Sequence, residues 1–211
     1  MKRLLLLLSV ILLPFAASAQ RTFQAGLQFG VNGSQIHGDF TSGFHKAGLV
    51  GGAYVGTDPT QQWYWRMEMQ YSMKGSKKYA RPNIGDFQTF EIRMNYAEIP
   101  MVAGINYRKF FFEGGLAGGV LVNMKTFDSF GLITPGTGYR RWELATVIGF
   151  GVRLNDKFDA NVRFTNSLLP VYQFYTPVYY SRRISNLFNR GMYHNVLGIS
   201  LYYHLPNKNK G

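Results

Sequence analysis

The most constraining feature of this sequence is a strict alternation of large apolar and polar residues over residues 63–74. Successive side chains of a β-strand point to opposite faces, so a period of two residues predicts a strand with two different faces. One face carries Trp63, Trp65, Met67, Met69, Tyr71 and Met73. The other face carries Tyr64, Arg66, Glu68, Gln70, Ser72 and Lys74. The first face suits contact with lipid, and the second suits a polar interior.

The same alternation recurs in segments 23–32, 142–154, 158–165 and 197–204, whereas helical periodicity is absent. Alternating segments of about ten residues, separated by turn residues, are typical of outer-membrane barrels. A soluble β-sandwich also alternates. The polar faces here, however, carry glycine and charges of both signs, and aromatic residues gather near strand ends, as membrane girdles require. The sequence therefore predicts an all-β fold, a transmembrane antiparallel β-barrel.

The first nineteen residues have the order of a secretory signal peptide. Lys2 and Arg3 are followed by the apolar run Leu4–Ala16 and then by small residues up to Ala19. The run is too short to span a bilayer, which takes about 20 residues, although an uncleaved anchor is the alternative. We expect a signal peptide at 1–19 and a barrel domain at 20–211, located in the bacterial outer membrane after export and cleavage. The chain has no cysteine, so no disulfide supports it.

Eight strands are predicted, and the connections between them alternate in length. The expected strands are 22–34, 45–56, 62–75, 88–106, 110–124, 139–154, 158–169 and 192–205. Short periplasmic turns and long outer loops are the rule for such barrels, which places the N-terminus in the periplasm. An additional hairpin over Val171–Tyr180 would give ten strands, but Pro170 and Pro177 disfavour it.

The fourth predicted strand contains a change of parity. Its first half has apolar residues at Phe90, Ile92, Met94 and Tyr96. Its second half has them on the opposite face, at Ile99, Met101, Ala103 and Ile105. A strand in one membrane keeps the same face toward lipid, so we expect a β-bulge between Ala97 and Pro100, where proline is tolerated.

Polar residues on the inward faces predict a filled interior, because an eight-stranded barrel is only wide enough for side chains. Both charge signs are present, and buried charges are expected to pair. The predicted charged network comprises Arg66, Glu68, Glu91, Arg93, Glu113, Glu143, Arg153, Asp159 and Arg163, and the uncharged inward candidates are Gln28, Gln70 and Asn95. We expect a plugged interior without a wide aqueous channel.

Three stretches resemble the PorT-like outer-membrane β-barrel family of bacteria: 38–49, 67–76 and 96–100. Together with the barrel pattern, the resemblance covers most of residues 22–205. One branch of that family is implicated in protein secretion across the outer membrane. The resemblance therefore implies secretion or envelope proteins as partners, and it supplies no functional residues to carry over.

Basic residues outnumber acidic ones. Without Lys2 and Arg3, 21 of the 23 basic residues remain against 11 acidic ones, a formal charge of +10. Export argues against a nucleic-acid partner, whereas outer-membrane lipid and phosphorylated glycolipid attract Lys and Arg. Candidate glycolipid-binding residues on the outer side are Lys74, Lys77, Lys78, Arg81, Arg140, Arg141, Arg182, Arg183 and Arg190. The alternative is an ordinary solvated loop surface.

No catalytic arrangement is evident in the sequence. Ser200 and His204 share a strand face, but four residues of strand separate them by about 13 Å, which is beyond hydrogen-bond reach. No metal-ligand spacing is present, and we expect no cofactor. The sequence favours a non-enzymatic barrel with a role in secretion or envelope integrity. The alternatives are a narrow porin and a lipid-modifying enzyme.

Overall fold

The computed structural model describes residues 23–37, 43–57, 61–133, 138–173 and 191–206. Ten strands and one short 3-10 helix form in these ranges. They are β1 (Phe23–His37), β2 (Lys46–Thr57), β3 (Trp63–Lys78), η1 (Pro82–Ile84), β4 (Phe90–Tyr107), β5 (Phe110–Asp128), β6 (Gly131–Ile133), β7 (Trp142–Arg153), β8 (Phe158–Ser167), β9 (Tyr172–Gln173) and β10 (Gly191–His204). Among these residues, none lies in a helix with the length and hydrophobicity that a membrane span requires.

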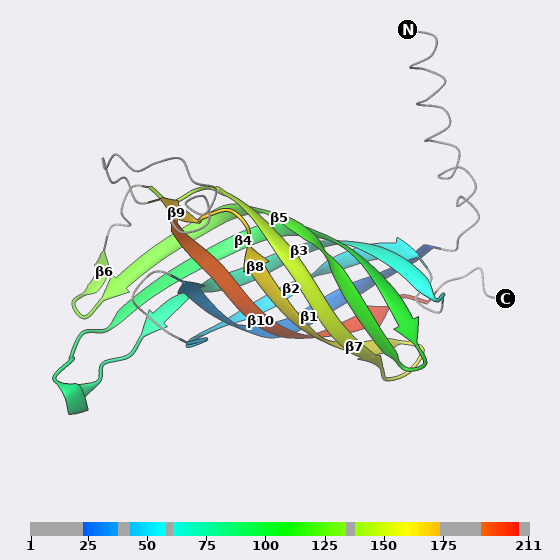
Figure 1. Ribbon diagram of the computed structural model, residues 1–211, viewed down its shortest axis with the longest axis horizontal. Coiled ribbons are helices and arrows are strands. Elements are labelled where there is room, and N and C mark those ends of the chain that lie inside the picture. The colour runs from blue at the N-terminus through cyan, green and yellow to red at the C-terminus, as the bar shows by residue number, and fades with distance from the viewer. Residues whose placement is uncertain (1–22, 38–42, 58–60, 134–137, 174–190, 207–211) are drawn as a thin grey trace, which may run out of the picture.

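The strands form a closed antiparallel barrel (Figure 1). Hydrogen-bonded neighbours run β1-β2-β3-β4-β5-β7-β8-β10, and β10 pairs back onto β1 from Gly26–His204 to His37–Tyr193. Of the ten strands, β6 and β9 lie outside this ring, as short additions to β5 and β10. The prediction of eight barrel strands is therefore confirmed.

The two ends of the barrel differ. At one end, tight turns join β4 to β5 and β7 to β8, and β1 begins and β10 ends there (Figure 1). We call this the short-turn end. At the other end, β3, β4 and β5 extend past the shorter strands and continue into η1 and β6, forming a wall (Figure 1). We call this the wall end.

The outer surface of the barrel is an apolar band. On β3, Trp63 and Met69 are 63% and 71% exposed, whereas the neighbouring Tyr64 and Arg66 are 7% and 6% exposed. β1, β7, β8 and β10 show the same alternation. The predicted apolar faces thus point outward and the polar faces point into the lumen, which is the reverse of a water-soluble β-protein.

The predicted bulge in β4 is wrong. β4 keeps one register against β3 along its length, and its inward set runs without interruption through Met94, Tyr96 and Glu98. The irregularity lies in β5 instead. Asn95 pairs with Asn123 while Tyr96 pairs with Leu121, so Val122 is an extra residue without a partner in β4.

The parity change in β4 has a different cause, which is a small apolar core at the wall end. Ile92, Met94 and Tyr96 turn inward there and pack with Ile36 and Val171, all at most 1% exposed. Partly buried residues complete this cluster: Phe90, Leu121, Met124, Tyr139 and Met192. Since β4 rises beyond the apolar band at this point, its apolar side chains bury themselves in protein rather than facing outward.

Candidate functional site

Two arginines and two glutamates form a closed set of ion pairs in the middle of the lumen. Arg66 donates from Nη2 to Glu113 at 2.6 Å and from Nε to Glu68 at 2.8 Å. Arg163, on β8, donates to Glu68 at 2.8 Å and to Glu113 at 2.6 Å. Each carboxylate thus contacts both guanidinium groups, and the formal charges cancel. We call these four residues the quartet.

Uncharged side chains complete the hydrogen bonding of the quartet. Tyr64 donates to Glu113 at 3.0 Å, Tyr202 donates to Glu68 at 3.1 Å, and Asn161 donates to Glu113 at 3.0 Å. The Arg66 guanidinium also lies 4.1 Å from the centre of the Tyr202 ring. Buried ions are tolerated when their remaining lone pairs and protons are satisfied in this way.

A second charged layer lies nearer the wall end. Lys74 forms ion pairs with Glu98 and with Glu143, the latter at 3.2 Å. His194 Nδ1 lies 3.4 Å from Glu143 Oε1, and Gln70 donates to Glu98 at 2.7 Å. All five side chains come from strand faces that point into the barrel, and together they form a second layer of polar contacts in the lumen.

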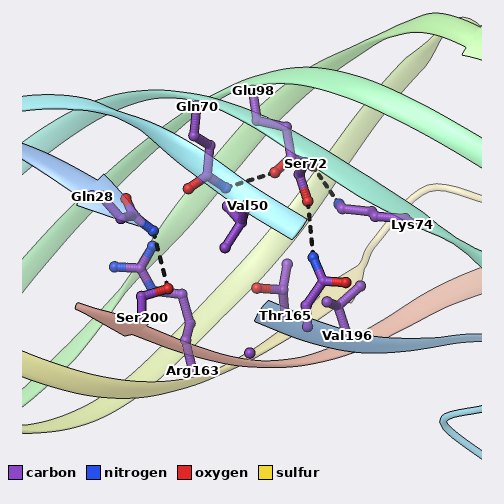
Figure 2. Close-up of a pocket in the computed structure, with 12 residues that line it drawn as sticks. Gln28, Val50, Gln70, Ser72, Lys74, Glu98, Arg163, Thr165, Val196 and Ser200 are labelled. Atoms are coloured by element: carbon purple, nitrogen blue, oxygen red, sulfur yellow. Dashed lines mark hydrogen bonds and ion pairs between the residues drawn. The ribbon is translucent and has the colours of Figure 1, made fainter. Parts of the chain in front are cut away.

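A cavity of about 30 Å³ separates the two layers. Figure 2 shows Lys74 and Glu98 on one side of the cavity and Arg163 on the other. Gln28 and Ser200 also line the cavity, and Gln28 donates a hydrogen bond to Ser200 at 3.4 Å. This volume holds a water molecule, for which about 10–15 Å³ suffices, but no larger solute. The space is therefore a gap in the packing of the lumen and not a substrate pocket.

A tyrosine, a histidine and an aspartate meet toward the short-turn end. The Tyr54 hydroxyl lies 2.5 Å from His204 Nδ1, and His204 Nε2 lies 3.0 Å from Asp159. Arg153 reaches the other Asp159 oxygen at 3.8 Å. Tyr54 and His204 are each 6% exposed and Asp159 is 2% exposed, so this cluster is buried inside the barrel. Ser200 contacts Gln28, and His204 has other partners, so these two residues form no dyad.

Three residues expected inside the barrel lie on its outer face. Glu91, Arg93 and Asn95 occupy the outward positions of β4 because the strand carries no bulge, and Arg93 is 52% exposed. For Lys74 the correction runs from the outer side to the lumen. It is a glycolipid-binding candidate at the outer end of its expected strand, but its side chain lies in the lumen at 2% exposure and pairs with Glu98.

The remaining candidate cations that the structure describes are scattered along the wall end. Lys77 lies 3.9 Å from Glu91, and Lys78 binds Asp86 at 2.8 Å. That hydrogen bond, together with one from the Gln88 backbone N–H, lowers the pKa of Asp86. Arg81 is exposed beside η1. Arg140 and Arg141 precede β7, half-buried and exposed respectively, while Arg182, Arg183 and Arg190 lie outside the described residues.

Sequence reasoning missed several members of the lumen network. Glu98 went unrecognised because the expected bulge obscured its parity, although it shares the inward face of β4 with Tyr96. His194 and His204 share the inward face of β10 with Tyr202, and their even-numbered positions in an alternating strand were the available signal. Which glutamate each cation would meet across the barrel was not encoded in any local pattern.

Comparison with known proteins agrees with this architecture. Residues 15–173 match the model of a family described as outer membrane protein beta-barrel domain. Neisserial surface protein A is 9% identical over 85% of this chain and 96% of its own, with a TM-score of 0.52. Ail, the attachment invasion locus protein of Yersinia pestis, is 10% identical over 87% and 99%, with a TM-score of 0.47. No curated protein matches in sequence.

Proposed function

We propose, from the premise that this chain belongs to the outer-membrane β-barrel domain family, that it is a non-enzymatic and non-conducting barrel which presents its wall end at the cell exterior. Short turns face the periplasm in such barrels, so the wall of β3, β4, β5 and β6 projects outward from the membrane. Its function is then to hold that wall in place for a partner protein of secretion or of the cell envelope, in line with the PorT-like resemblance.

The observation that carries the proposal is the quartet. Arg163 from β8 binds Glu68 on β3 and Glu113 on β5, so the ion pairs span the lumen between strands that are not neighbours in the ring. Opening a path would separate buried charges, which costs several kcal/mol for each ion left unpaired. The apolar cluster around Tyr96 adds a second obstruction at the wall end. This arrangement argues against the narrow porin.

Conductance in planar lipid bilayers tests the closed lumen. The purified mature barrel should give no discrete current steps, while a general diffusion porin incorporated under the same conditions should give them. Reproducible steps from the wild-type protein, abolished by removing it from the preparation, would overturn the proposal in favour of a porin.

The wall itself supports a binding role. Phe87, Phe130 and Leu132 are 70%, 99% and 66% exposed at its tips, beyond the apolar band. Apolar side chains gathered on a surface in water often mark an interaction site. A photo-crosslinking residue at Phe130 should therefore capture an envelope protein in intact cells, whereas one at Lys109, at the short-turn end, should not capture the same protein. Identical adducts from both positions would contradict a specific surface.

The lipid-modifying enzyme receives no support from the lumen, where His194 and His204 are buried against carboxylates. Comparing lipid A from cells with and without the gene provides the check. An unchanged mass spectrum is expected.

A further inference from the structure

The bulge at Val122 decides which side chains of β5 face outward beyond it. Before the bulge, the even-numbered residues up to Val120 point outward. After it, Thr126 is 4% exposed and faces the lumen, while Lys125 is exposed. One extra residue therefore turns Lys125 to the outer face of the barrel.

This places Lys125 directly opposite Arg93 in the β4–β5 ladder. Lys77 lies one row further toward the wall end, opposite Glu91. Like charges directly opposite each other destabilise a sheet, so the pairing of Arg93 with Lys125 needs a compensating anion. We call Lys77, Arg93 and Lys125 the basic row.

Protein carboxylates compensate this row only in part. Among the described residues, Glu91 is the one carboxylate within ion-pair distance of these cations, at 2.7 Å from Arg93 and 3.9 Å from Lys77. Glu91 also lies 3.8 Å from Lys46. Glu91 thus has three cations within ion-pair distance, whereas no described ion pair involves Lys125, which is exposed on the outer face. The Arg93 guanidinium lies 4.7 Å from the centre of the Phe127 ring, a cation–π contact that holds it in position.

The basic row lies at the border of the apolar band. One step from it toward the band, Asn95 pairs with Asn123, and beyond this polar pair Val120, Val122 and Ile99 are 39%, 60% and 49% exposed. Cations directly above an apolar stripe match the chemistry of a phosphorylated lipid: phosphate oxygens meet Arg and Lys, and acyl chains meet the aliphatic side chains.

We infer that the basic row binds a phosphate group of an outer-leaflet glycolipid, whose acyl chains lie along Val120 and Val122. The inference rests on the proposed placement of the wall end at the cell exterior, but it does not depend on the closed lumen. The occupant is a lipid and not free phosphate, because the site continues into the apolar band.

Native mass spectrometry of the mature barrel released from nanodiscs tests the inference. One set of nanodiscs holds phosphatidylcholine with bis-phosphorylated lipid A, and the other holds the same lipid A without its phosphates. Wild-type protein should retain the phosphorylated form. The R93Q/K125Q variant should retain it about tenfold less, as expected for the loss of charge-assisted hydrogen bonds. Excess inorganic phosphate should not displace the lipid.

The matched control is K109Q/K157Q, which removes two exposed cations at the short-turn end. It should retain lipid A as the wild type does. Equal retention by R93Q/K125Q, equal retention of dephosphorylated lipid A by the wild type, or full displacement by inorganic phosphate would each overturn the inference.

Folding is checked by the heat-dependent shift in gel mobility. If the double variant does not fold, Lys125→Gln alone carries the test, since no described ion pair involves Lys125, with an expected loss of about threefold. Current steps in the bilayer assay would refute the closed lumen and leave this result standing.

Discussion

Arg163 and Glu68 are ninety-five residues apart in the chain and form a two-bond contact in the lumen, with Nη1 to Oε2 at 2.8 Å and Nη2 to Oε1 at 2.9 Å. Their strands, β8 and β3, are not neighbours in the ring. The contact therefore joins opposite sides of the barrel, whereas backbone hydrogen bonds join only neighbouring strands. Two parallel bonds to a planar guanidinium also fix the orientation of the Glu68 carboxylate.

Removing one partner of this contact should destabilise the barrel strongly. Glu68→Ala leaves two buried guanidinium groups with less compensation, and we expect a loss of about 3–5 kcal/mol in the free energy of unfolding. Urea titration in lipid vesicles, followed by fluorescence of the three tryptophans, measures it. The double variant E68M/R163M should recover much of the loss, because it removes both charges. Asp156→Asn, in an exposed turn, is the control and should change stability by less than about 0.5 kcal/mol. A loss for Glu68→Ala no larger than that of the control would contradict the ring of ion pairs.

Gly151 provides a test of packing in the lumen. A Cβ atom at this position would lie 2.0 Å from the Phe111 ring, whereas one at Gly118, on the outer face of β5, would meet no atom within 4 Å. Gly151→Ala should therefore cost about 1–3 kcal/mol in the same unfolding experiment, since the ring must move in a filled interior. Gly118→Ala should cost clearly less. Equal effects would show that the Phe111 ring does not occupy the position described.

The bulge can be tested with cysteine labelling, because the chain contains no native cysteine. A membrane-impermeant maleimide should label Lys125→Cys on intact cells and leave Thr126→Cys unlabelled. Deleting Val122 removes the extra residue and shifts the parity of the segment beyond it, so the labelling should reverse. Labelling of both positions with and without Val122 would argue against a defined register in this part of β5.

The tip of the wall should respond to acid through Asp86. Its pKa is lowered first by the hydrogen bond from Lys78 and then by the Gln88 backbone N–H, so the contact is complete above the ordinary aspartate pKa. It should be lost only as the pH falls through the folded-state pKa, which lies below the ordinary aspartate pKa. The NMR shift of the Gln88 amide should report this step. The step should be absent in Asp86→Asn, and a transition near neutral pH in the wild type would contradict the assignment.

Much of the fold was predictable from the sequence because the membrane imposes a period of two residues over long segments. Trp63 to Met73 showed both the strand and its lipid-facing side. The parity of β4 could not be interpreted in the same way, since Ile92, Met94 and Tyr96 are as apolar as a lipid-facing set. Periodicity shows that two faces differ, but it does not show whether the apolar face meets lipid or a local protein core.

The bulge in β5 was missed for a related reason. Glycine and apolar residues occupy both faces of 110–122, so no contrast marked the position of the extra residue. The lumen contacts were less predictable still. That Arg66 and Glu68 face inward follows from parity, but their bonds to Glu113 and Arg163 depend on how the ring closes.

The seam between β1 and β10 has a consequence for assembly. It joins the first strand of the barrel to the last, so every residue of the ring must be synthesised before the seam can form, and such distant pairings are slow. Until then, β1 exposes unpaired backbone groups along an open edge. Because the quartet lies in the lumen, we expect its arginines and glutamates to stay hydrated until the seam closes. A chain that lacks β10 would therefore have two defects. The edge of β1 would stay unpaired, and the charged side chains of the quartet would stay hydrated.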